Sequence, residues 1–341
     1  MKEVLIEGPY FEDFKKGEFL EQAPSVTINN SHATVHQMLF GDRLRLPLDQ
    51  HLSLSITGKN TPVANPSMVI SVAIGQSTYA TQNVMGNLFY RGLVLKKPVY
   101  LGDTLTTTTQ VVALRQNKAK PGRAASGMVV LEICAKDQDG REILHFWRCP
   151  MVPCRDPNIE TGHTDDLGAL SAEISHEALL SAIPNDWDLA KFKQVINGQH
   201  FDQVEEGVNV RIKARDTVTL APELTRLTLN MAMTHTDAGA SVYGQRLVYG
   251  GHTIAIAAAQ VLRAMPNILT LLAWRHCDHL APVFEDDILR TELLVVKKTA
   301  SSNGGGFVDL QVKVWAERGS NAPTNEQDIQ VLDWGLVALL A

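Results

Sequence analysis

The segment RLVYGGHTIAIAAAQVLRAMP, residues 246–266, combines residue types that suit the stabilisation of a negatively charged oxygen. Gly250 and Gly251 stand where a helix is predicted to begin, and Pro266 stops that helix. The N–H groups of a first helical turn lack intrahelical partners and lie at the positive end of the helix dipole. Because glycine has no side chain, an oxygen that gains negative charge can approach them closely. The alternative is that the two glycines only make a tight turn or allow close helix packing.

A second polar group lies just before this helix, in LNMAMTHTDAG, residues 229–239. Asn230 and His235 flank a short apolar run, and Asp237 follows the histidine by two positions. A neutral imidazole can take a proton from water near pH 7 and return it. A single histidine can equally be a structural residue. It is the pair of glycines downstream that favours proton transfer by His235.

The sequence repeats itself, which indicates one fold used twice. PVYLGDTLTTT begins at Pro98 and PVFEDDILRTE begins at Pro282, an offset of 184 positions. FEDFKKG, residues 11–17, is echoed by FDQVEEG, residues 201–207. The two halves therefore look like diverged copies of one domain.

Each copy has the same predicted order of elements. One helix, residues 66–82 in the first copy and 250–265 in the second, precedes three antiparallel strands. In the first copy the last two strands flank an Asp139-Gly140 turn, which predicts a hairpin. The second helix is apolar around most of its circumference, as expected of a helix wrapped by a sheet.

One long helix inside a curved antiparallel sheet is a hot-dog fold, so we predict an α+β chain with a tandem, or double, hot-dog fold. The predicted first domain spans residues 1–155 and holds a degenerate site that shapes the acyl pocket. A linker follows over residues 156–195, rich in Asp, Pro, Gly and Ser, with one amphipathic piece at 171–183. The predicted catalytic domain spans residues 196–341.

The first copy lacks most of the chemistry of the second. On the 184 offset, Pro66 stands opposite Gly250, and proline has no N–H to donate. His51 falls opposite His235, but Leu46 falls opposite Asn230. A second complete active site is therefore not expected.

Composition excludes several classes of function. The formal net charge of −6 gives no general attraction to nucleic acid, and no apolar run is long enough to span a membrane. The N-terminal sequence lacks the order of a signal peptide, which predicts a cytoplasmic protein. The four cysteines have no paired spacing, so neither a zinc site nor a disulfide framework is predicted. HCDH, residues 276–279, offers too few metal ligands and is assigned to the edge of a strand.

NMAMTH followed by RLVYGGH resembles the signature of the MaoC-type, R-specific enoyl-CoA hydratases, and the likeness extends over YFEDFKKGE, KKPVYLGDTL and HCDHLAPVFEDD. Within that family, the two-domain mesaconyl-CoA (2-methylfumaryl-CoA) hydratases are the most similar, since they also have an Asn in the first motif position and YGGH at the helix. The resemblance implies addition of water to a 2-enoyl-CoA thioester, or the reverse dehydration. The acyl-CoA is then the partner, with no nucleic acid or membrane, and no metal or separate cofactor is implied. A monomer or a homodimer is expected.

Carried over residue by residue, the resemblance makes His235 the proton-transferring group, with Asn230 holding the water. Gly250, with Gly251 beside it, would donate to the thioester oxygen. Because many members have Asp where this chain has Asn230, Asp237 is a candidate supporting carboxylate or, alternatively, a cap of its own loop. Residues predicted to bind substrate are His279, Tyr249 and His252.

Two other functions stay open at this point. Hot-dog folds also serve acyl-CoA thioesterases, but the helix from His252 to Arg263 contains no Asp or Glu to assist hydrolysis. A non-catalytic acyl-CoA-binding subunit is the third possibility. The substitution to Asn230 favours it, and His235 with its glycines argues against it.

Overall fold

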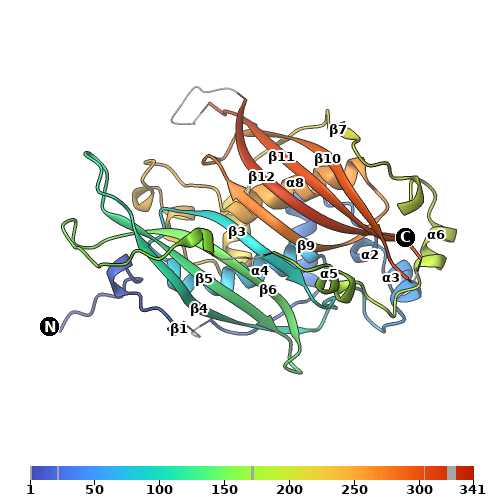
Figure 1. Ribbon diagram of the computed structural model, residues 1–341, viewed down its shortest axis with the longest axis horizontal. Coiled ribbons are helices and arrows are strands. Elements are labelled where there is room, and N and C mark those ends of the chain that lie inside the picture. Colours follow the sequence, from blue (N-terminus) through green and yellow to red (C-terminus); the bar gives the residue numbers. More distant parts are fainter. Residues whose placement is uncertain (1, 21–22, 170–172, 303, 321–327) are drawn as a thin grey trace.

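The computed structural model describes residues 2–20, 23–169, 173–302, 304–320 and 328–341 (Figure 1). Within these residues, the strands form one antiparallel sheet in the order β1-β4-β5-β6-β3-β9-β12-β11-β10-β7, with β2 paired to β4 and β8 to β10. The strands of the first copy are β1 (Phe19–Leu20), β2 (Val26–Thr27), β3 (Gly86–Leu95), β4 (Thr104–Gln116), β5 (Ser126–Lys136) and β6 (Glu142–Pro153). Those of the second are β7 (Asn209–Arg211), β8 (Asp216–Thr217), β9 (Ile268–His279), β10 (Ile288–Ala300), β11 (Gly306–Glu317) and β12 (Ile329–Leu340).

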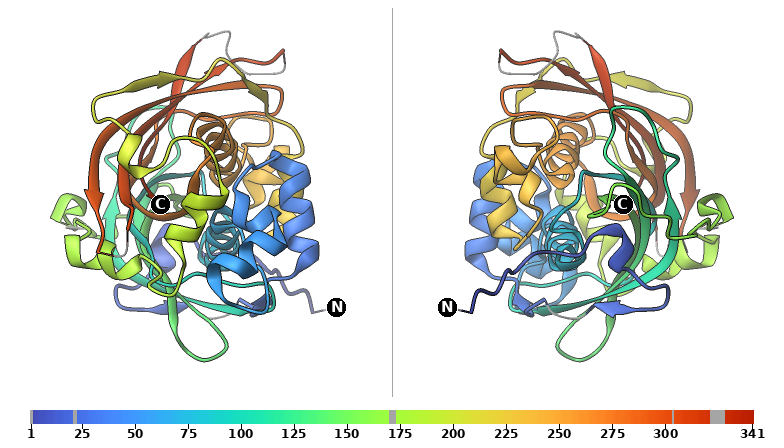
Figure 2. Two further views of the ribbon diagram at one scale, coloured as in Figure 1. Left: turned by 90° about the vertical axis from the view of Figure 1, so that its right-hand side faces the viewer. Right: turned by 90° about the vertical axis from the view of Figure 1, so that its left-hand side faces the viewer.

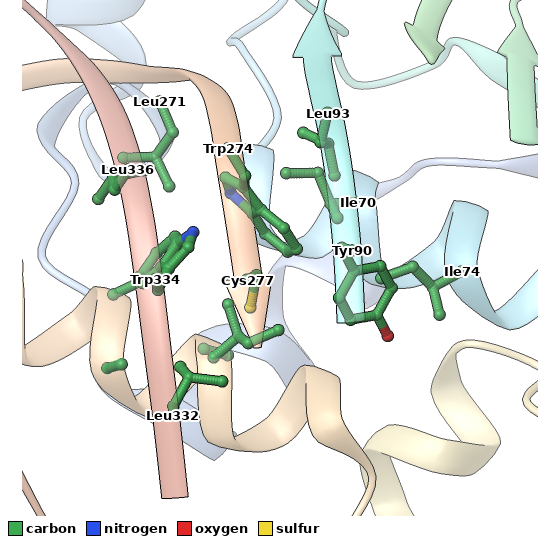
Figure 3. Packing of buried hydrophobic residues seen from close by; sticks show 14 of the residues in the cluster. Ile70, Ile74, Tyr90, Leu93, Leu271, Trp274, Cys277, Leu332, Trp334 and Leu336 are labelled. Carbon is green, nitrogen blue, oxygen red and sulfur yellow. The ribbon is translucent and has the colours of Figure 1, made fainter. Parts of the chain in front are cut away.

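The two copies join through the antiparallel pairing of β3 with β9 at the middle of the sheet. Aromatic side chains pack this seam. The Trp274 ring on β9 lies 5.7 Å from the Tyr90 ring on β3 and 5.5 Å from the Trp334 ring on β12, measured between centroids, and both contacts are edge-on (Figure 3). All three side chains are nearly fully buried.

The sheet curves around two helices that lie side by side, α4 (Pro66–Gln76) and α8 (Gly250–Ala264) (Figure 2). Every residue of α4 is buried, as are residues 251–262 of α8. The repeat is visible in their polar contacts. Gln76 Nε2 donates to Leu105 O at 3.0 Å, and Gln260 Nε2 donates to Leu289 O at the same distance, each pair 184 positions from the other.

Further helices cover the side of α4 and α8 that faces away from the sheet (Figure 2). They are α1 (Asn30–Phe40), α2 (Arg45–Leu48), α3 (Gln50–Thr57) and α7 (Ala221–Leu227). Between the copies, α5 (His176–Ala182) and α6 (Leu189–Val195) place apolar side chains in one cluster with residues of β3, β9 and β12. Residues 171 and 172 of the predicted amphipathic piece lie outside the described residues, and α5 forms within its remainder.

The double hot-dog fold predicted from the sequence is confirmed, with both central helices and the hairpin at Asp139-Gly140. The prediction of three strands after each helix is wrong, because four long strands follow. The missed strands are β3 and β9. Most of β9 is buried, with α5 contributing to the cover on its outer face, so it lacks the alternation of apolar and polar residues that marks a half-exposed strand.

In the part of the chain that the structure describes, no helix is both long and apolar enough to cross a membrane. All four cysteines are free.

Candidate active site

A cavity of about 200 Å³ lies where α8 begins. Its lining comes from both copies: the ends of β3, β6 and β9, the loop before His235, and the first turn of α8. Tyr243 and Leu280 line it and are exposed, which marks the side open to solvent. A cavity of this volume has room for a short acyl group.

His235 ends a 3₁₀ turn, Met233–His235, and lines this cavity. Its Nδ1 lies 2.7 Å from the Leu247 carbonyl oxygen, and Leu247 N donates to Thr234 O at 2.9 Å. A carbonyl can only accept, so Nδ1 carries the proton and Nε2 keeps its lone pair. Burial lowers the pKa of His235 to about 4. The imidazole is therefore neutral at pH 7, held against the segment that leads into α8.

Gly250 is the first residue of α8 and lines the same cavity. Among the described residues, its N–H has no hydrogen-bond acceptor, and no side chain caps the helix. The contrast with α4 is clear, because there Asn65 Oδ1 accepts from Ser67 N at 2.9 Å. Only the second copy thus presents an open helix N-terminus to the cavity.

His279, at the end of β9, stands over this helix start. A Cβ added to Gly250 would lie 2.6 Å from His279 Nε2, so glycine is needed for this close approach. His279 lines the cavity, and its buried Nε2 has no partner among the described residues. Burial, with a smaller contribution from the nearby His235, lowers the pKa of His279 to about 4. HCDH ends β9, in agreement with its assignment to the edge of a strand, and β9 pairs with β3 on one side and β12 on the other.

Asn230 also lines the cavity and is mostly buried. Its Oδ1 accepts from Ala232 N at 2.9 Å, which leaves the side-chain amide N–H groups free of acceptors among the described residues. The amide can therefore donate to a water oxygen beside His235, but it cannot act as a base.

Tyr249 lines the cavity as the residue before α8, with its ring 5.6 Å from that of His235. Its hydroxyl donates to Ser71 O on α4 at 3.3 Å. Burial raises the pKa of Tyr249 well above its usual value, so the hydroxyl is protonated. Gly251 does not line the cavity. An added Cβ there would lie 2.7 Å from the Tyr249 ring, so this glycine serves packing.

Two predicted site residues lie away from the cavity. Asp237 is exposed, and its Oδ1 accepts from Gly239 N at 2.8 Å, so it caps its own loop. His252 points to the opposite side of α8, where its ring packs edge-on against Phe40 of α1 at 4.9 Å. The prediction that His252 binds substrate therefore differs from its position in the structure. Two residues along a helix correspond to about half a turn, so the side chain of His252 faces nearly opposite to the side on which Gly250 lines the cavity.

The first copy assembles no matching set. His51 is exposed on α3, Leu46 is buried, and Pro66 occupies the first turn of α4. Among the described residues, no three His, Cys, Asp or Glu side chains gather in a metal-ligand arrangement.

Among the cavity residues that the sequence does not predict are Arg148 on β6 and Tyr90 on β3. A signal existed for the arginine. In HFWRCPMV, Arg148 has the same strand parity as Phe146 and Val152, both fully buried, so a period of two places it inside. Burial lowers the pKa of the Arg148 guanidinium, which nonetheless stays charged at neutral pH.

The fold and the site define the class of this protein: a double hot-dog enzyme of the hydratase type. The sequence model of the mesaconyl-CoA hydratase family matches residues 2–264, and the chain belongs to that family. The family predicted from the sequence motifs is thereby confirmed.

Individual relatives agree with this assignment. The chain is 27% identical over 319 residues to the β-methylmalyl-CoA dehydratase of Chloroflexus aurantiacus, covering 91% of this chain and 88% of the relative. It is 26% identical over 303 residues to the mesaconyl-CoA hydratase of Cereibacter sphaeroides, covering 87% and 86%. A solved conserved hypothetical protein of Mycobacterium tuberculosis with a double hot-dog fold aligns with a TM-score of 0.89 and 44% identity, over 98% of this chain and 99% of that one.

Proposed function

We propose that this protein adds water to the double bond of a short branched 2-enoyl-CoA thioester, and catalyses the reverse dehydration, with mesaconyl-CoA as the first candidate substrate. One observation carries the proposal. A neutral imidazole with a free Nε2 and a helix N-terminus without an acceptor line one cavity of acyl size. The names of the two relatives support the choice of substrate.

His235 performs the proton transfers in this proposal. Its Nε2 takes a proton from water while the water oxygen bonds to C3 of the enoyl group. The electron pair of the C2–C3 double bond shifts toward the thioester carbonyl and gives an enolate. The imidazolium then returns the proton to C2, so the elements of water are added and His235 is regenerated. Asn230 donates to the attacking water and fixes its position.

Gly250 stabilises the charge that develops on the thioester oxygen. Its N–H lies at the positive end of α8 and has no acceptor among the described residues. A donor placed at such an oxyanion contributes about 3 kcal/mol to the transition state. Gly251 and Asp237 have no direct part in this mechanism, since neither lines the cavity.

A thioesterase is the runner-up function, and the lining of the cavity speaks against it. Among the described residues of the lining, none is Asp or Glu, so no carboxylate is placed to activate water toward the carbonyl carbon. A binding subunit without activity would not require a polarised imidazole beside an open helix end.

The test uses the purified protein with crotonyl-CoA and mesaconyl-CoA. Hydration removes the ultraviolet absorbance of the enoyl thioester without releasing free thiol, whereas hydrolysis releases thiol. In deuterium oxide, hydration also places deuterium on C2 of the product. His235→Gln is the matched control, since it keeps a polar side chain of similar reach. Thiol release by the parent, or no reaction with either substrate, would contradict the proposal.

We infer further that the CoA of the substrate is the only cofactor-like group required, because the proposed chemistry needs one base and one hydrogen-bond donor. Pairing of β3 with β9 already joins the two hot-dog copies within one chain. A monomer or a homodimer is therefore proposed, to be tested by light scattering. Cytoplasmic location stays a prediction from the N-terminal sequence, testable by cell fractionation.

A further inference from the structure

Two arginines are buried in the described part of the chain, and they differ in their partners. Arg318 Nη1 donates to the Asp287 carboxylate at 2.7 Å, so its charge is neutralised inside the protein. Arg148 is 3% exposed and has no carboxylate partner among the described residues. A buried charge without a counter-charge is costly, which makes Arg148 the exception that requires an explanation.

The Arg148 guanidinium is held from one side only. Its Nη2 donates to Ser77 O and to Thr81 Oγ1, both at 2.9 Å. Nε is buried and has no acceptor among the described residues, and no bond of Nη1 to them is formed. Nη1 therefore keeps its N–H groups, from which a carboxylate oxygen can accept a charge-assisted hydrogen bond.

Tyr90 adds a donor next to this guanidinium. It is the register partner of Arg148 on the neighbouring strand, so both side chains leave the same face of the sheet. Tyr90 is 1% exposed and its hydroxyl has no hydrogen bond to a described residue. In Figure 3 that hydroxyl points away from Trp274, on the side of Ile74, another residue of the cavity lining.

Within the described residues, the lining of the cavity carries a positive charge and no negative one. Among its described lining residues, Arg148 is the one permanent cation, and none is acidic. The same small cavity holds His235 and Gly250, the groups assigned to the reacting acyl carbons. The phosphates of CoA are separated from the acyl group by the long pantetheine arm, so an anion that meets Arg148 belongs to the acyl group.

We propose that Arg148 and Tyr90 are the residues of this chain that receive the free carboxylate of the acyl group, forming a receptor for it, and that they determine the preference of the chain for acyl-CoA thioesters that carry one. This inference rests on the proposed hydratase function and deepens it by assigning specificity to residues of the first copy. The carboxylate supplies the counter-charge that Arg148 lacks. It also fixes the acyl group at the end remote from the thioester, so that the double bond lies between Arg148 and Gly250.

Binding of two unreactive thioesters tests the receptor without depending on turnover. Succinyl-CoA and butyryl-CoA have acyl chains of equal length, and only the first carries a carboxylate. Calorimetric titration should give the parent a dissociation constant for succinyl-CoA about 10- to 100-fold below that for butyryl-CoA, the range of one charge-assisted hydrogen-bonded pair. Arg148→Gln should abolish this preference, and Arg148→Lys should keep part of it.

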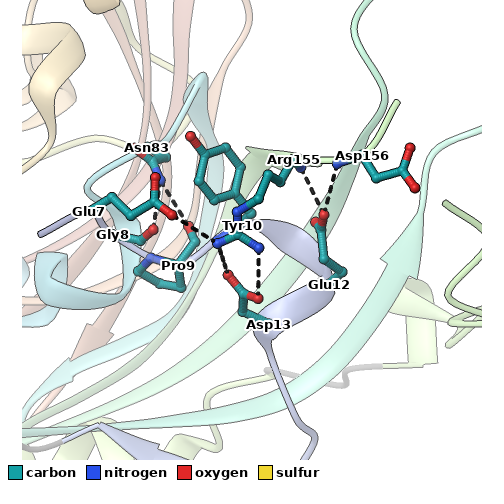
Figure 4. A network of polar contacts seen from close by, with 9 residues as sticks. All are labelled: Glu7, Gly8, Pro9, Tyr10, Glu12, Asp13, Asn83, Arg155 and Asp156. Atoms are coloured by element: carbon teal, nitrogen blue, oxygen red, sulfur yellow. Dashed lines mark hydrogen bonds and ion pairs between the residues drawn. The ribbon is translucent and has the colours of Figure 1, made fainter. Parts of the chain in front are cut away.

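Two more variants separate recognition from folding. Tyr90→Phe keeps the ring and the guanidinium, and should weaken the preference by about 3- to 10-fold. Arg155→Gln is the matched arginine control. Arg155 is exposed, pairs with Asp13 at 2.9 Å and lies over the Tyr10 ring, outside the cavity lining (Figure 4). It should retain the full preference for succinyl-CoA.

The outcomes are distinct from those of the hydration assay. Equal affinity of the parent for the two thioesters, or an unchanged preference in folded Arg148→Gln, would overturn the receptor while leaving hydration intact. Preference lost with Arg148→Gln in a protein that hydrates neither enoyl-CoA would support the receptor and refute the proposed reaction. Circular dichroism establishes that each variant is folded before it is compared.

Discussion

Gly75 of α4 and Thr228 of the loop before the active site touch through their backbones, so that a Cβ added to Gly75 would lie 1.8 Å from the Thr228 carbonyl oxygen. Two hydrogen bonds continue this contact along the loop. Met231 N donates to Thr78 Oγ1, and Met233 N donates to Gln82 O, both at 2.9 Å. The first copy, which lacks a catalytic set of its own, therefore holds the loop that carries Asn230 and His235.

Gly75→Ala should damage activity from a distance. The added methyl group forces the loop away from α4, and displacement of a catalytic group by about 1 Å can lower turnover about 100-fold. Overpacking of this kind also costs about 1 to 3 kcal/mol of unfolding free energy. Urea denaturation and the hydration assay measure the two effects. Gly168→Ala, on an exposed turn between the copies, is the control that should change neither. Normal activity of Gly75→Ala would show that the loop tolerates displacement.

Gly250→Ala tests the close approach at the start of α8. The new methyl group would lie 2.6 Å from His279 Nε2, next to the N–H that donates to the thioester oxygen in the proposed mechanism. Alanine keeps the N–H but obstructs the approach to it, so we expect kcat/KM to fall about 100-fold, the range of one lost oxyanion hydrogen bond. His279→Ala removes the clash but leaves the methyl group at the helix end. If the double variant recovered parental activity, the loss in Gly250→Ala would come from displacement of His279 and not from obstruction of the N–H.

Much of the fold follows from the sequence because its signals are local or repeated. The offset of 184 identifies equivalent elements, and Pro266 and the apolar run define α8. The central strands β3 and β9 lack such signals. Most of β9 is buried, and neither strand shows a regular alternation of buried and exposed residues. Their identity depends on the pairing between copies, which no local pattern encodes.

The candidate site likewise contains some residues that the sequence predicts and others that only the fold reveals. His235, Asn230 and Gly250 are close in sequence to one helix start, so motif spacing places them together. Arg148 lies in the other copy, and only the fold brings it to the same cavity. His252 and Asp237 show the opposite error, because proximity in sequence did not place their side chains in the cavity.

The pH dependence of hydration should report the lowered pKa of His235. Burial takes this pKa from its ordinary 6.5 to about 4, so the base stays neutral and competent far below neutral pH. The acid limb of kcat/KM should therefore fall near pH 4, without a step near 6.5. Stopped-flow pH jumps separate this titration from slow acid unfolding. A limb centred near 6.5 would identify a solvent-exposed base instead of His235.

His235→Gln should lower turnover about 100-fold or more at pH 7, the usual range for loss of a general base. Thermal unfolding checks that the fold survives the loss of the ring and of its hydrogen bond to Leu247 O. A folded variant with near-parental activity would contradict the assignment of the base.

Substitutions of Asn230 and Asp237 should differ in their effect on activity. Asp237→Asn should keep kcat/KM within about threefold of the parent. Among the described residues its carboxylate accepts only from Gly239 N, at the exposed loop, and an amide oxygen can do the same. Asn230→Ala removes the donor to water and the turn bond to Ala232 N, and should lower kcat by about 10-fold or more. Steady-state kinetics with mesaconyl-CoA measures both. A large loss in Asp237→Asn would return that carboxylate to the mechanism.

Two buried histidines outside the active site should make stability depend on pH. The ring of Phe40 lies 4.9 Å from that of His36 and 4.9 Å from that of His252. Burial lowers the pKa of His36 to about 3 and that of His252 to about 4. In the unfolded chain both pKa values return to about 6.5, so unfolding takes up protons below that pH.

The sign of the effect follows from these shifts. The full stability is present above pH 6.5, and it declines as the pH falls toward 4, at up to about 1.4 kcal/mol per pH unit for each histidine. Urea denaturation at a series of pH values measures this slope. His252→Gln should reduce the slope by about one proton while leaving kcat/KM at pH 7.5 within about threefold of the parent, since His252 faces Phe40 and not the cavity. An unchanged slope would mean that His252 is not buried in its neutral form, and a large loss of kcat/KM in the folded variant would restore its predicted contact with substrate.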